Sequence, residues 1–510
     1  MKRFQSRYVS WLLTLAFGLV VFLFWRFRYP FALTYQEQLQ LFLFDDDFFL
    51  ERMAEPGGFA RYIAEFLVQF YNGVTIGAVI IAVLFMLLQR LTWRVMHSDG
   101  HYALSFIPVS MLWFSMGDEN VMLTYGVSLL LALVAMVGWD SVSRFNRYVR
   151  WGVVIVAVPL LYWLIGPMVL LVAVWMQPLS VVYALTIMLL SAHYLPFPMQ
   201  RVMLGISYYR VPITMPYMLL VIPAVILLLG YCVRRLPAPK PWVNWAERVL
   251  LAALVVWPQE FGFSQKKYDL IEYDYLVRVR DWQAIIAKAE KKSPDLPMSV
   301  CANNLALAMT NQLGERVLDF YQRSSEGLLP KFERNFATTQ LTGEVYFHLG
   351  LVNTAQRLAF EAMEAIPNYN KSPRVIKRLA ETNLINGEYD VARKYLQILE
   401  KTIFYRPWAK RTMAMLGDEK AIDAHPLYGK MRQYRLQEDF LFSEQELDKI
   451  CGQLFMHNQQ NTMAMQYLVM TPLLDGDAQR FMAYVSYVQS KVNYNPRYVR
   501  EAIAKIGRMR

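Results

Sequence analysis

The first half of the chain is dominated by long apolar runs, whereas the second half alternates apolar and polar positions. Before about residue 260, segments such as 73–89, 121–139 and 213–233 contain almost only apolar residues. A helix needs about 20 apolar residues to cross a bilayer, and a soluble core does not need uninterrupted runs of that length. The pattern therefore predicts a bundle of transmembrane helices over residues 1–263.

The apolar runs predict eight or nine spans. They lie near residues 11–28, 73–89, 102–115, 121–139, 150–165, 167–176, 179–194, 213–233 and 245–257. The runs 102–115 and 167–176 are too short for a simple crossing, so we expect half-helices whose backbone is satisfied by surrounding protein. The count depends on the stretch 166–197, because Gln177-Pro178 interrupts it and proline disrupts a continuous helix.

The Lys and Arg residues of the short loops indicate the orientation, because cytoplasmic loops carry an excess of them. The basic N-terminus and the clusters at 90–94 and 144–150 are expected inside. If the ambiguous stretch crosses twice, the basic loop 234–240 also falls inside, while Arg201 and Arg210 fall outside. We favour this arrangement, which makes the C-terminal half extracytoplasmic.

From about residue 266 a helix-turn-helix rhythm begins. Asp281, Gly314, Gly350 and Gly387 each stand where one amphipathic segment ends and another opens, at steps of 33, 36 and 37 residues. Repeats of this length are typical of tetratricopeptide-like arrays, in which neighbours stack because one repeat cannot bury its apolar face alone. The sequence predicts an all-α protein, with a polytopic bundle at 1–263 and a soluble tetratricopeptide-like domain at 264–510. The three glycines are expected at turns.

Composition and charge limit the partners. The chain is 55% hydrophobic and only 18% charged, against about 25% charged for a typical soluble domain. The net charge of +11 is spread evenly, with 18 Lys/Arg and 13 Asp/Glu up to residue 263 and 34 and 28 after it. Nucleic acid binding favours a concentrated basic stripe, so nucleic acid is not an expected partner, whereas the lipid bilayer is. The three cysteines form no CxxC pair and are expected to be structural thiols.

The segment 29–72, between the first two spans, is the most unusual part of the membrane half. It contains Asp45, Asp46 and Asp47, and residues 35–71 within it are expected to form two short interfacial helices hinged near Pro56-Gly57-Gly58. A carboxylate above the membrane can act as a general base on an acceptor hydroxyl, and several together can hold a divalent ion. The alternative is that the three aspartates cap and charge the N-terminus of a helix, with no catalytic or metal-binding role. The sequence leaves the metal and any cofactor unknown.

Four further polar residues lie in predicted outer loops. Asp118 and Glu119 form an acidic turn, and Arg201 and Arg210 flank a Tyr-Tyr pair. Asp118 and Glu119 can converge with the acids of the first loop on one cavity at the membrane surface, and the two arginines can bind a lipid phosphate. Solvated turns and interfacial anchors have the same pattern. HExxH, GxSxG, Walker and dinucleotide motifs are absent from the sequence, so the common soluble-enzyme chemistries have no support.

The phrases Pro-Gly-Gly-Phe at 56–59 and Arg-Leu-Ala-Glu-Thr-Asn at 378–383 resemble a family of uncharacterised multi-pass membrane proteins of bacteria, chiefly Bacteroidetes. The resemblance covers nearly the whole chain and implies an inner-membrane protein without an established activity. More distantly, the layout resembles the C-type glycosyltransferases, some of which carry C-terminal tetratricopeptide repeats. Those enzymes place acidic residues in the first extracytoplasmic loop, where Asp45 to Asp47 stand here.

Two functions follow from these patterns. The first is a glycosyltransferase-like enzyme that uses a lipid-linked sugar at the outer membrane face, with Asp45, Asp46 and Asp47 as catalytic residues and Asp118, Glu119, Arg201 and Arg210 as substrate-binding residues. The second is a non-catalytic scaffold or envelope assembly factor that binds a protein partner through its repeats. A cavity lined by the loop acids favours the enzyme, and a solid bundle favours the scaffold. A transporter ranks below both, because charged residues are almost absent from the spans.

Overall fold

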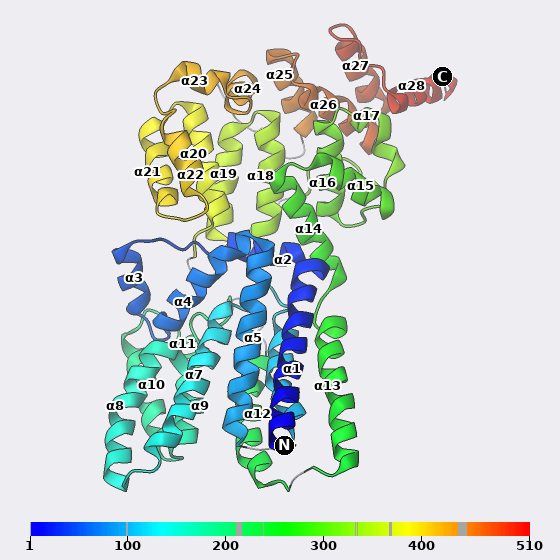
Figure 1. Cartoon of the computed structure of the whole chain (residues 1–510). Helices are drawn as coiled ribbons and strands as arrows, with labels where there is room; N and C mark the ends of the chain where they lie inside the picture. The colour runs from blue at the N-terminus through cyan, green and yellow to red at the C-terminus, as the bar shows by residue number, and fades with distance from the viewer. Residues whose placement is uncertain are drawn as a thin grey trace. The chain divides into compact units, whose positions relative to one another are not determined.

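In the computed structural model of the protein, the chain divides into two compact units, residues 1–268 and 269–510 (Figure 1). We refer to them as the membrane unit and the helical unit. The structure describes residues 2–97, 100–210, 217–237, 239–331, 333, 335–366, 370–436 and 446–509. Every regular element in these ranges is a helix, which confirms the predicted all-α fold.

The membrane unit contains thirteen α-helices in its described ranges, joined by short 3-10 and π-helical pieces. They are α1 (Lys2–Leu23), α2 (Pro30–Gln38), α3 (Asp46–Met53), α4 (Gly58–Val68), α5 (Val74–Met96), α6 (Ile107–Ser115), α7 (Leu123–Val142), α8 (Arg147–Ile165), α9 (Val169–Met176), α10 (Ser180–Tyr194), α11 (Met199–Leu204), α12 (Tyr217–Cys232) and α13 (Pro241–Phe261).

Five segments are long and apolar enough to cross a membrane. They are Tyr8–Arg28, Val74–Met96, Leu123–Val142, Arg147–Met176 and Tyr217–Arg235. Between 33 and 50% of the most apolar window of each is buried, so much apolar surface faces outward, as hydrocarbon surroundings require. These are the features of a membrane protein. Tyr102–Ser115 and Ser180–Tyr194 are shorter apolar helices, and the total of eight or nine spans stays a prediction.

The loop between the first two spans contains three short α-helices, α2, α3 and α4, and the turn between α3 and α4 contains Gly57. This glycine has a left-handed backbone, with φ of 81°, and its N–H donates to the carbonyl of Trp163 at 2.8 Å. A Cβ atom at Gly57 would lie 3.3 Å from the Cα of Gly166. Glycine is therefore required twice, for the turn and for the close approach of the loop to the end of α8.

The helical unit begins within α14 (Gln265–Val279), which crosses the boundary between the units. Its other helices are α15 (Trp282–Lys291), α16 (Pro297–Met309), α17 (Leu313–Arg316), α18 (Phe336–Leu349), α19 (Val352–Glu364), α20 (Pro373–Asn386), α21 (Tyr389–Glu400), α22 (Arg406–Met413), α23 (Glu419–Ala424), α24 (Tyr428–Tyr434), α25 (Leu447–His457), α26 (Thr462–Asp475), α27 (Ala478–Gln489) and α28 (Arg497–Met509).

The same turn follows five of these helices. After α14, α16, α18, α20 and α26 comes one residue with positive φ: Arg280, Asn311, Gly350, Gly387 and Gly476. Its N–H donates to the carbonyl three residues earlier, and the next N–H donates to the carbonyl five residues before itself. This is the Schellman arrangement, which satisfies carbonyls left open at a helix C-terminus. It accounts for the recurring phrases in the sequence.

Two of the three glycines expected at turns, Gly350 and Gly387, occupy this left-handed position. The expectation for Gly314 is wrong. Gly314 lies inside the short helix α17, and Asn311 makes the turn instead. Asparagine tolerates the left-handed region better than other side chains, so it replaces glycine there at small cost.

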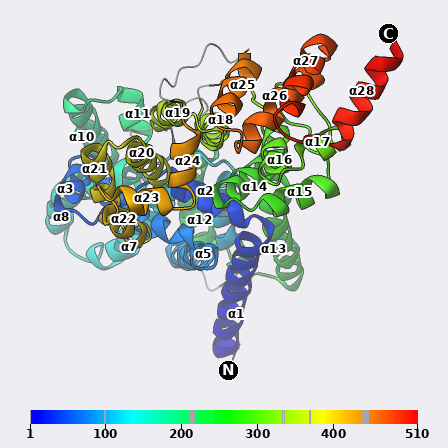
Figure 2. The same ribbon diagram turned by 90° about the horizontal axis from the view of Figure 1, so that it is seen from above.

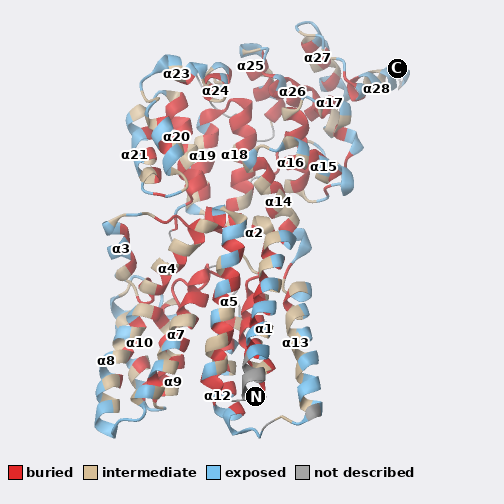
Figure 3. Cartoon of the chain, viewed as in Figure 1, coloured by how far each residue is buried: buried red, intermediate tan, exposed pale blue. Residues whose placement is uncertain are grey.

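One continuous apolar core joins the helical unit from α14 to α28, and residues such as Phe347, Leu384 and Tyr467 are fully buried in it. Helices α18 to α21 lie side by side in both views, each in contact with the next (Figures 1 and 2). Helices α18 and α20 are buried over most of their length, whereas α19 and α21 mix buried and exposed positions (Figure 3). Stacked helix pairs of this kind leave neighbouring helix ends free to line a shared pocket.

Candidate functional site

The three predicted catalytic acids lie at the start of α3. Asp45 is at the N-cap position with an extended backbone, is partly buried, and makes no side-chain capping bond. Asp46 and Asp47 occupy the first helical turn and are exposed. Acidic residues in a first turn are stabilised by the helix dipole. The catalytic assignment of these three residues stays a prediction.

A different carboxylate is buried in the same loop. Glu65 of α4 is 2% exposed, and its two oxygens accept from Nε of Arg52 at 2.7 Å and Nε of Arg61 at 2.9 Å. Arg61 also reaches Glu55 at 3.0 Å. Burial lowers the pKa of Arg61, but the attraction of Glu65 and Glu55 outweighs it and leaves the pKa raised. This network joins α3 to α4 and holds the loop together.

The acidic turn and Arg210 come together. The backbone N–H of Arg210 donates to the carbonyl of Asn120 at 2.7 Å, and its Nη1 donates to the carbonyl of Glu119. Arg210 is 1% exposed, and its Nε and Nη2 have no hydrogen-bond partner among the residues that the structure describes. Burial lowers the pKa of Arg210 to about 10, and nearby Tyr35, Glu119 and Asp118 offset only part of that shift. Glu119 itself pairs with Lys267.

Arg201 lies apart from that turn, on α11, where its guanidinium is 5.1 Å from the ring of Phe197. A cavity of about 180 Å³ lies nearby, between α7, α9, α11 and α12. Leucine, methionine, proline and tyrosine residues line it, and none of the seven predicted site residues does. This apolar cavity therefore differs from the acid-lined cavity that the enzyme hypothesis expects.

A larger pocket, of about 550 Å³, lies in the helical unit. It forms where the ends of α14, α16 and α18 meet α20, α24 and the start of α26. Its volume is within the range of small-molecule and peptide-anchor sites. Four cations line it, together with three aromatic residues, two histidines and one acid: Arg278, Arg280, Lys377, Lys430, Trp408, Tyr428, Tyr434, His348, His425 and Glu381.

None of the four lining cations forms an ion pair within 4 Å with a carboxylate in the described ranges. Aromatic rings position three of them instead. Nζ of Lys377 lies 4.9 Å from the ring centre of Trp408, and Nζ of Lys430 lies 5.3 Å from that of Tyr434. The guanidinium of Arg278 lies 5.2 Å from the ring of Tyr275. Rings hold a cation without neutralising it, so the positive charge stays available.

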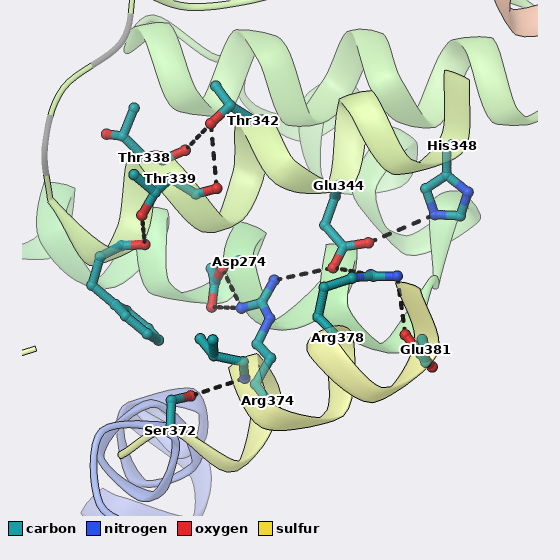
Figure 4. Close-up of polar contacts among 12 residues, drawn as sticks. Asp274, Thr338, Thr339, Thr342, Glu344, His348, Ser372, Arg374, Arg378 and Glu381 are labelled. Atoms are coloured by element: carbon teal, nitrogen blue, oxygen red, sulfur yellow. Dashed lines mark hydrogen bonds and ion pairs between the residues drawn. The ribbon is translucent and has the colours of Figure 1, made fainter. Parts of the chain in front are cut away.

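A buried ion network adjoins this pocket, since Glu381 belongs to both (Figure 4). Arg374 donates to Asp274 at 2.8 Å, and Arg378 donates to Glu344 at 2.7 Å and to Glu381 at 3.0 Å. Burial raises the pKa of Glu344, but Arg378 and Arg374 outweigh it and lower that pKa to about 2. Because Glu381 is already paired, the one lining acid does not neutralise the four cations.

The two lining histidines are neutral near pH 7. Burial lowers the pKa of His348 to about 3, and Arg280 and Arg378 add to the shift against the attraction of Glu344. Burial also lowers the pKa of His425, whose Nδ1 accepts from the N–H groups of Leu427 and Tyr428 at 3.3 Å. Since Nδ1 is an acceptor, Nε2 carries the proton and can donate to a ligand.

The net charge of the pocket is positive even when the charges of the neighbouring groups are counted. The five groups of the network, Asp274, Arg374, Glu344, Arg378 and Glu381, carry one net negative charge. Three helix C-termini meet at the pocket, and each contributes roughly half a negative charge. The four cations exceed this total by more than one charge. The arrangement is therefore suited to an anionic ligand. In the described part of the chain, no group of three His, Cys, Asp or Glu residues could hold a metal ion.

The family model of DUF6057, described as a family of unknown function, matches residues 6–507. The chain belongs to this family. Membership of DUF6057 confirms the resemblance to an uncharacterised family over nearly the whole chain. No curated protein and no solved structure matches the chain.

The pocket was not predicted from the sequence. Its lining residues run from Arg278 to Met463, so no local motif connects them. One signal was present: Arg280 precedes Asp281 at the first of the recurring turns, where the later phrases have glycine. The hydrogen bonds of the five turns, which the structure supplies, show that Arg280 occupies the position that glycine has in three of them.

Proposed function

We propose that this DUF6057 protein is a membrane-anchored scaffold that holds a protein partner in the pocket of its helical unit. The observation that carries the proposal is the 550 Å³ pocket with four cations, none of which pairs with a carboxylate among the described residues. Unpaired charge is costly to keep in a concave site, because desolvation by the walls is not repaid until a ligand binds. A surface that served only to close the fold would favour paired or apolar residues.

The membrane unit supplies the anchor in this account. Its five apolar spans fix the chain in a bilayer, and the basic residues of 90–94 and 144–150 belong to one side by the positive-inside rule. We infer a bacterial inner-membrane location with the helical unit on the extracytoplasmic side. There, partners would be proteins of the cell envelope.

A lipid-linked sugar transferase is the second candidate. The observation that favours it is Arg210, beside the Asp118–Glu119 turn. Two nitrogens of its buried guanidinium have no hydrogen-bond partner in the described ranges. A donor phosphate would satisfy such a group. We rank it second because the described cavity in this unit has an apolar lining without a carboxylate.

Site-specific photo-crosslinking in cells tests the scaffold. A benzophenone amino acid at Leu427, in the pocket wall, is expected to capture a discrete partner protein with the full-length chain in its native membrane. The control position is Val391 on α21, which is 37% exposed and lies outside the pocket. Equal capture at both positions, or none at Leu427, would contradict partner binding in the pocket.

A further inference from the structure

Arg280 has a backbone conformation that its side chain does not favour. Its φ is 60°, in the left-handed region, where L-residues crowd their own carbonyl. The other four Schellman turns use glycine three times and asparagine once at this position. The turn itself does not need an arginine, because glycine makes the same two hydrogen bonds at Gly350 and Gly387.

The strained residue lies in the pocket. Arg280 is half-buried and lines the pocket with Arg278, and it makes no ion pair within 4 Å among the residues that the structure describes. Residues held in unfavourable backbone regions concentrate at binding sites, where function retains what stability would remove. Arg280 combines three such features: strain, a concave position and an unpaired charge.

We propose that the pocket binds a short acidic segment of a partner protein and that Arg280 is held in its strained conformation to bind a carboxylate of that segment. This inference rests on the proposed scaffold function and names the chemistry of the partner. It assigns to the pocket an extended peptide with several carboxylates, rather than one small anion.

The placement of the cations favours a peptide. They come from the end of α14, the turn after it, α20 and α24, so they reach the pocket from several separate elements. One phosphate would engage only some of them. An extended chain advances about 3.3 Å per residue and presents alternate side chains to opposite sides, so it offers carboxylates to several cations at once. Met309, Met431 and Met463 also line the pocket and supply adaptable apolar contacts between the charges.

Binding of a synthetic peptide to the full-length protein in detergent micelles tests the inference. The probe is a short fluorescent peptide in which Glu alternates with Leu, and its control has Gln in place of every Glu. We expect the Glu peptide alone to bind, and Arg280→Gly to weaken it roughly tenfold to a hundredfold, the range for one lost charged hydrogen bond. The same substitution should raise the thermal midpoint by about 2–4 °C, since it relieves the strain.

A matched substitution separates backbone relief from charge loss. Asn311→Gly changes the equivalent position of the second turn, which lies outside the pocket, and should leave peptide binding unchanged. Arg280→Asn also removes the charge, and asparagine tolerates positive φ. This variant replaces Arg280→Gly in the binding test if Arg280→Gly folds poorly. Weaker binding with either Arg280 variant at a wild-type or raised midpoint supports the proposal.

Three results would overturn the inference. They are equal binding of the Glu and Gln peptides, unchanged binding by both Arg280 variants, and displacement of the peptide by inorganic phosphate at the peptide's own concentration. The last result identifies a site for simple anions. If the Glu peptide does not bind while Leu427 still captures a protein in cells, the scaffold function stands and the acidic-segment assignment fails.

Discussion

At the scale of single residues, Glu344 joins two arginines in the buried ion network beside the pocket. Its carboxylate accepts from Arg378 at 2.7 Å and lies 3.7 Å from Arg374, and all three side chains are largely buried. Glu344→Gln would leave two buried guanidinium groups short of negative charge, which costs about 3–5 kcal/mol for a broken buried pair. We expect a clearly lowered thermal midpoint for the full-length protein in detergent.

The control is Glu361→Gln, which removes the half-buried partner of exposed Arg357 in a surface pair 3.8 Å apart. Surface pairs of this kind contribute at most about 1 kcal/mol. Similar midpoints for the two variants would show that the buried network does not stabilise the helical unit.

His348 makes stability depend on pH. The pKa of His348 is about 3 in the folded chain and 6.5 in the unfolded chain. Between these two values the ring is protonated in the unfolded chain but not in the folded chain. The stability associated with the neutral ring is complete above pH 6.5 and is lost as pH falls toward 3. The slope approaches about 1.4 kcal/mol per pH unit. Glu344 adds to the loss only below about pH 4.5, because its pKa falls from 4.5 to about 2.

The prediction is that His348→Gln reduces the drop in thermal midpoint between pH 7 and pH 5, since the variant does not titrate there. His457→Gln, at an exposed position of α25, is the control and should keep the wild-type drop. An unchanged drop in His348→Gln would mean that the ring is protonated in the fold.

At the scale of elements, the Schellman turns allow a paired test of backbone strain. Gly387 has φ of 86° and no atom within 4 Å of an added Cβ, so Gly387→Ala should cost only the left-handed penalty of about 1–2 kcal/mol. Gly350 has φ of 99°, and its Cβ would lie 2.7 Å from that of Tyr434. Gly350→Ala should therefore lower the thermal midpoint more. Equal effects would mean that α24 does not pack against this turn.

The hydrophobic pattern was enough to predict the class of element in each half. Long apolar runs marked the spans, and the spacing of Gly350 and Gly387 marked two of the turns, because many helices end in a left-handed residue and glycine adopts it readily. The third turn was predicted at Gly314 because glycine was expected at every turn. Asn311 and Arg280 make the same bonds without glycine, and only the backbone conformation shows this.

The candidate sites were harder to predict, for a physical reason. A run of acids such as Asp45 to Asp47 is conspicuous in a sequence, yet two of the three are exposed at a helix start. Glu65 is isolated in the sequence but is buried between Arg52 and Arg61. Whether a charge is solvated or paired depends on residues brought together by folding, which periodicity does not encode.

At the scale of the whole molecule, the orientation of the helical unit follows from the span count and charge bias and can be measured. Cys301 and Cys451 are buried and burial raises the pKa of both thiols, so only exposed Cys232 needs replacement before labelling. In a Cys232→Ser background, Ser490→Cys at an exposed site should react with a membrane-impermeant maleimide on intact spheroplasts. Reaction only after lysis would place the helical unit in the cytoplasm and remove the lipid-linked transferase as a candidate.

The central claim is that the protein acts through the pocket of the helical unit and not through the acids of the membrane loop. The most direct measurement is the yield of the Leu427 crosslink in cells for two sets of variants at matched membrane expression. One set combines Lys377→Glu and Lys430→Glu, and the other combines Asp45→Asn, Asp46→Asn and Asp47→Asn, which retains the capacity for capping. We predict that the charge reversals abolish the crosslink and that the three asparagines leave it at the wild-type yield. Loss of the crosslink in the asparagine set, with normal yield after charge reversal, would contradict the account.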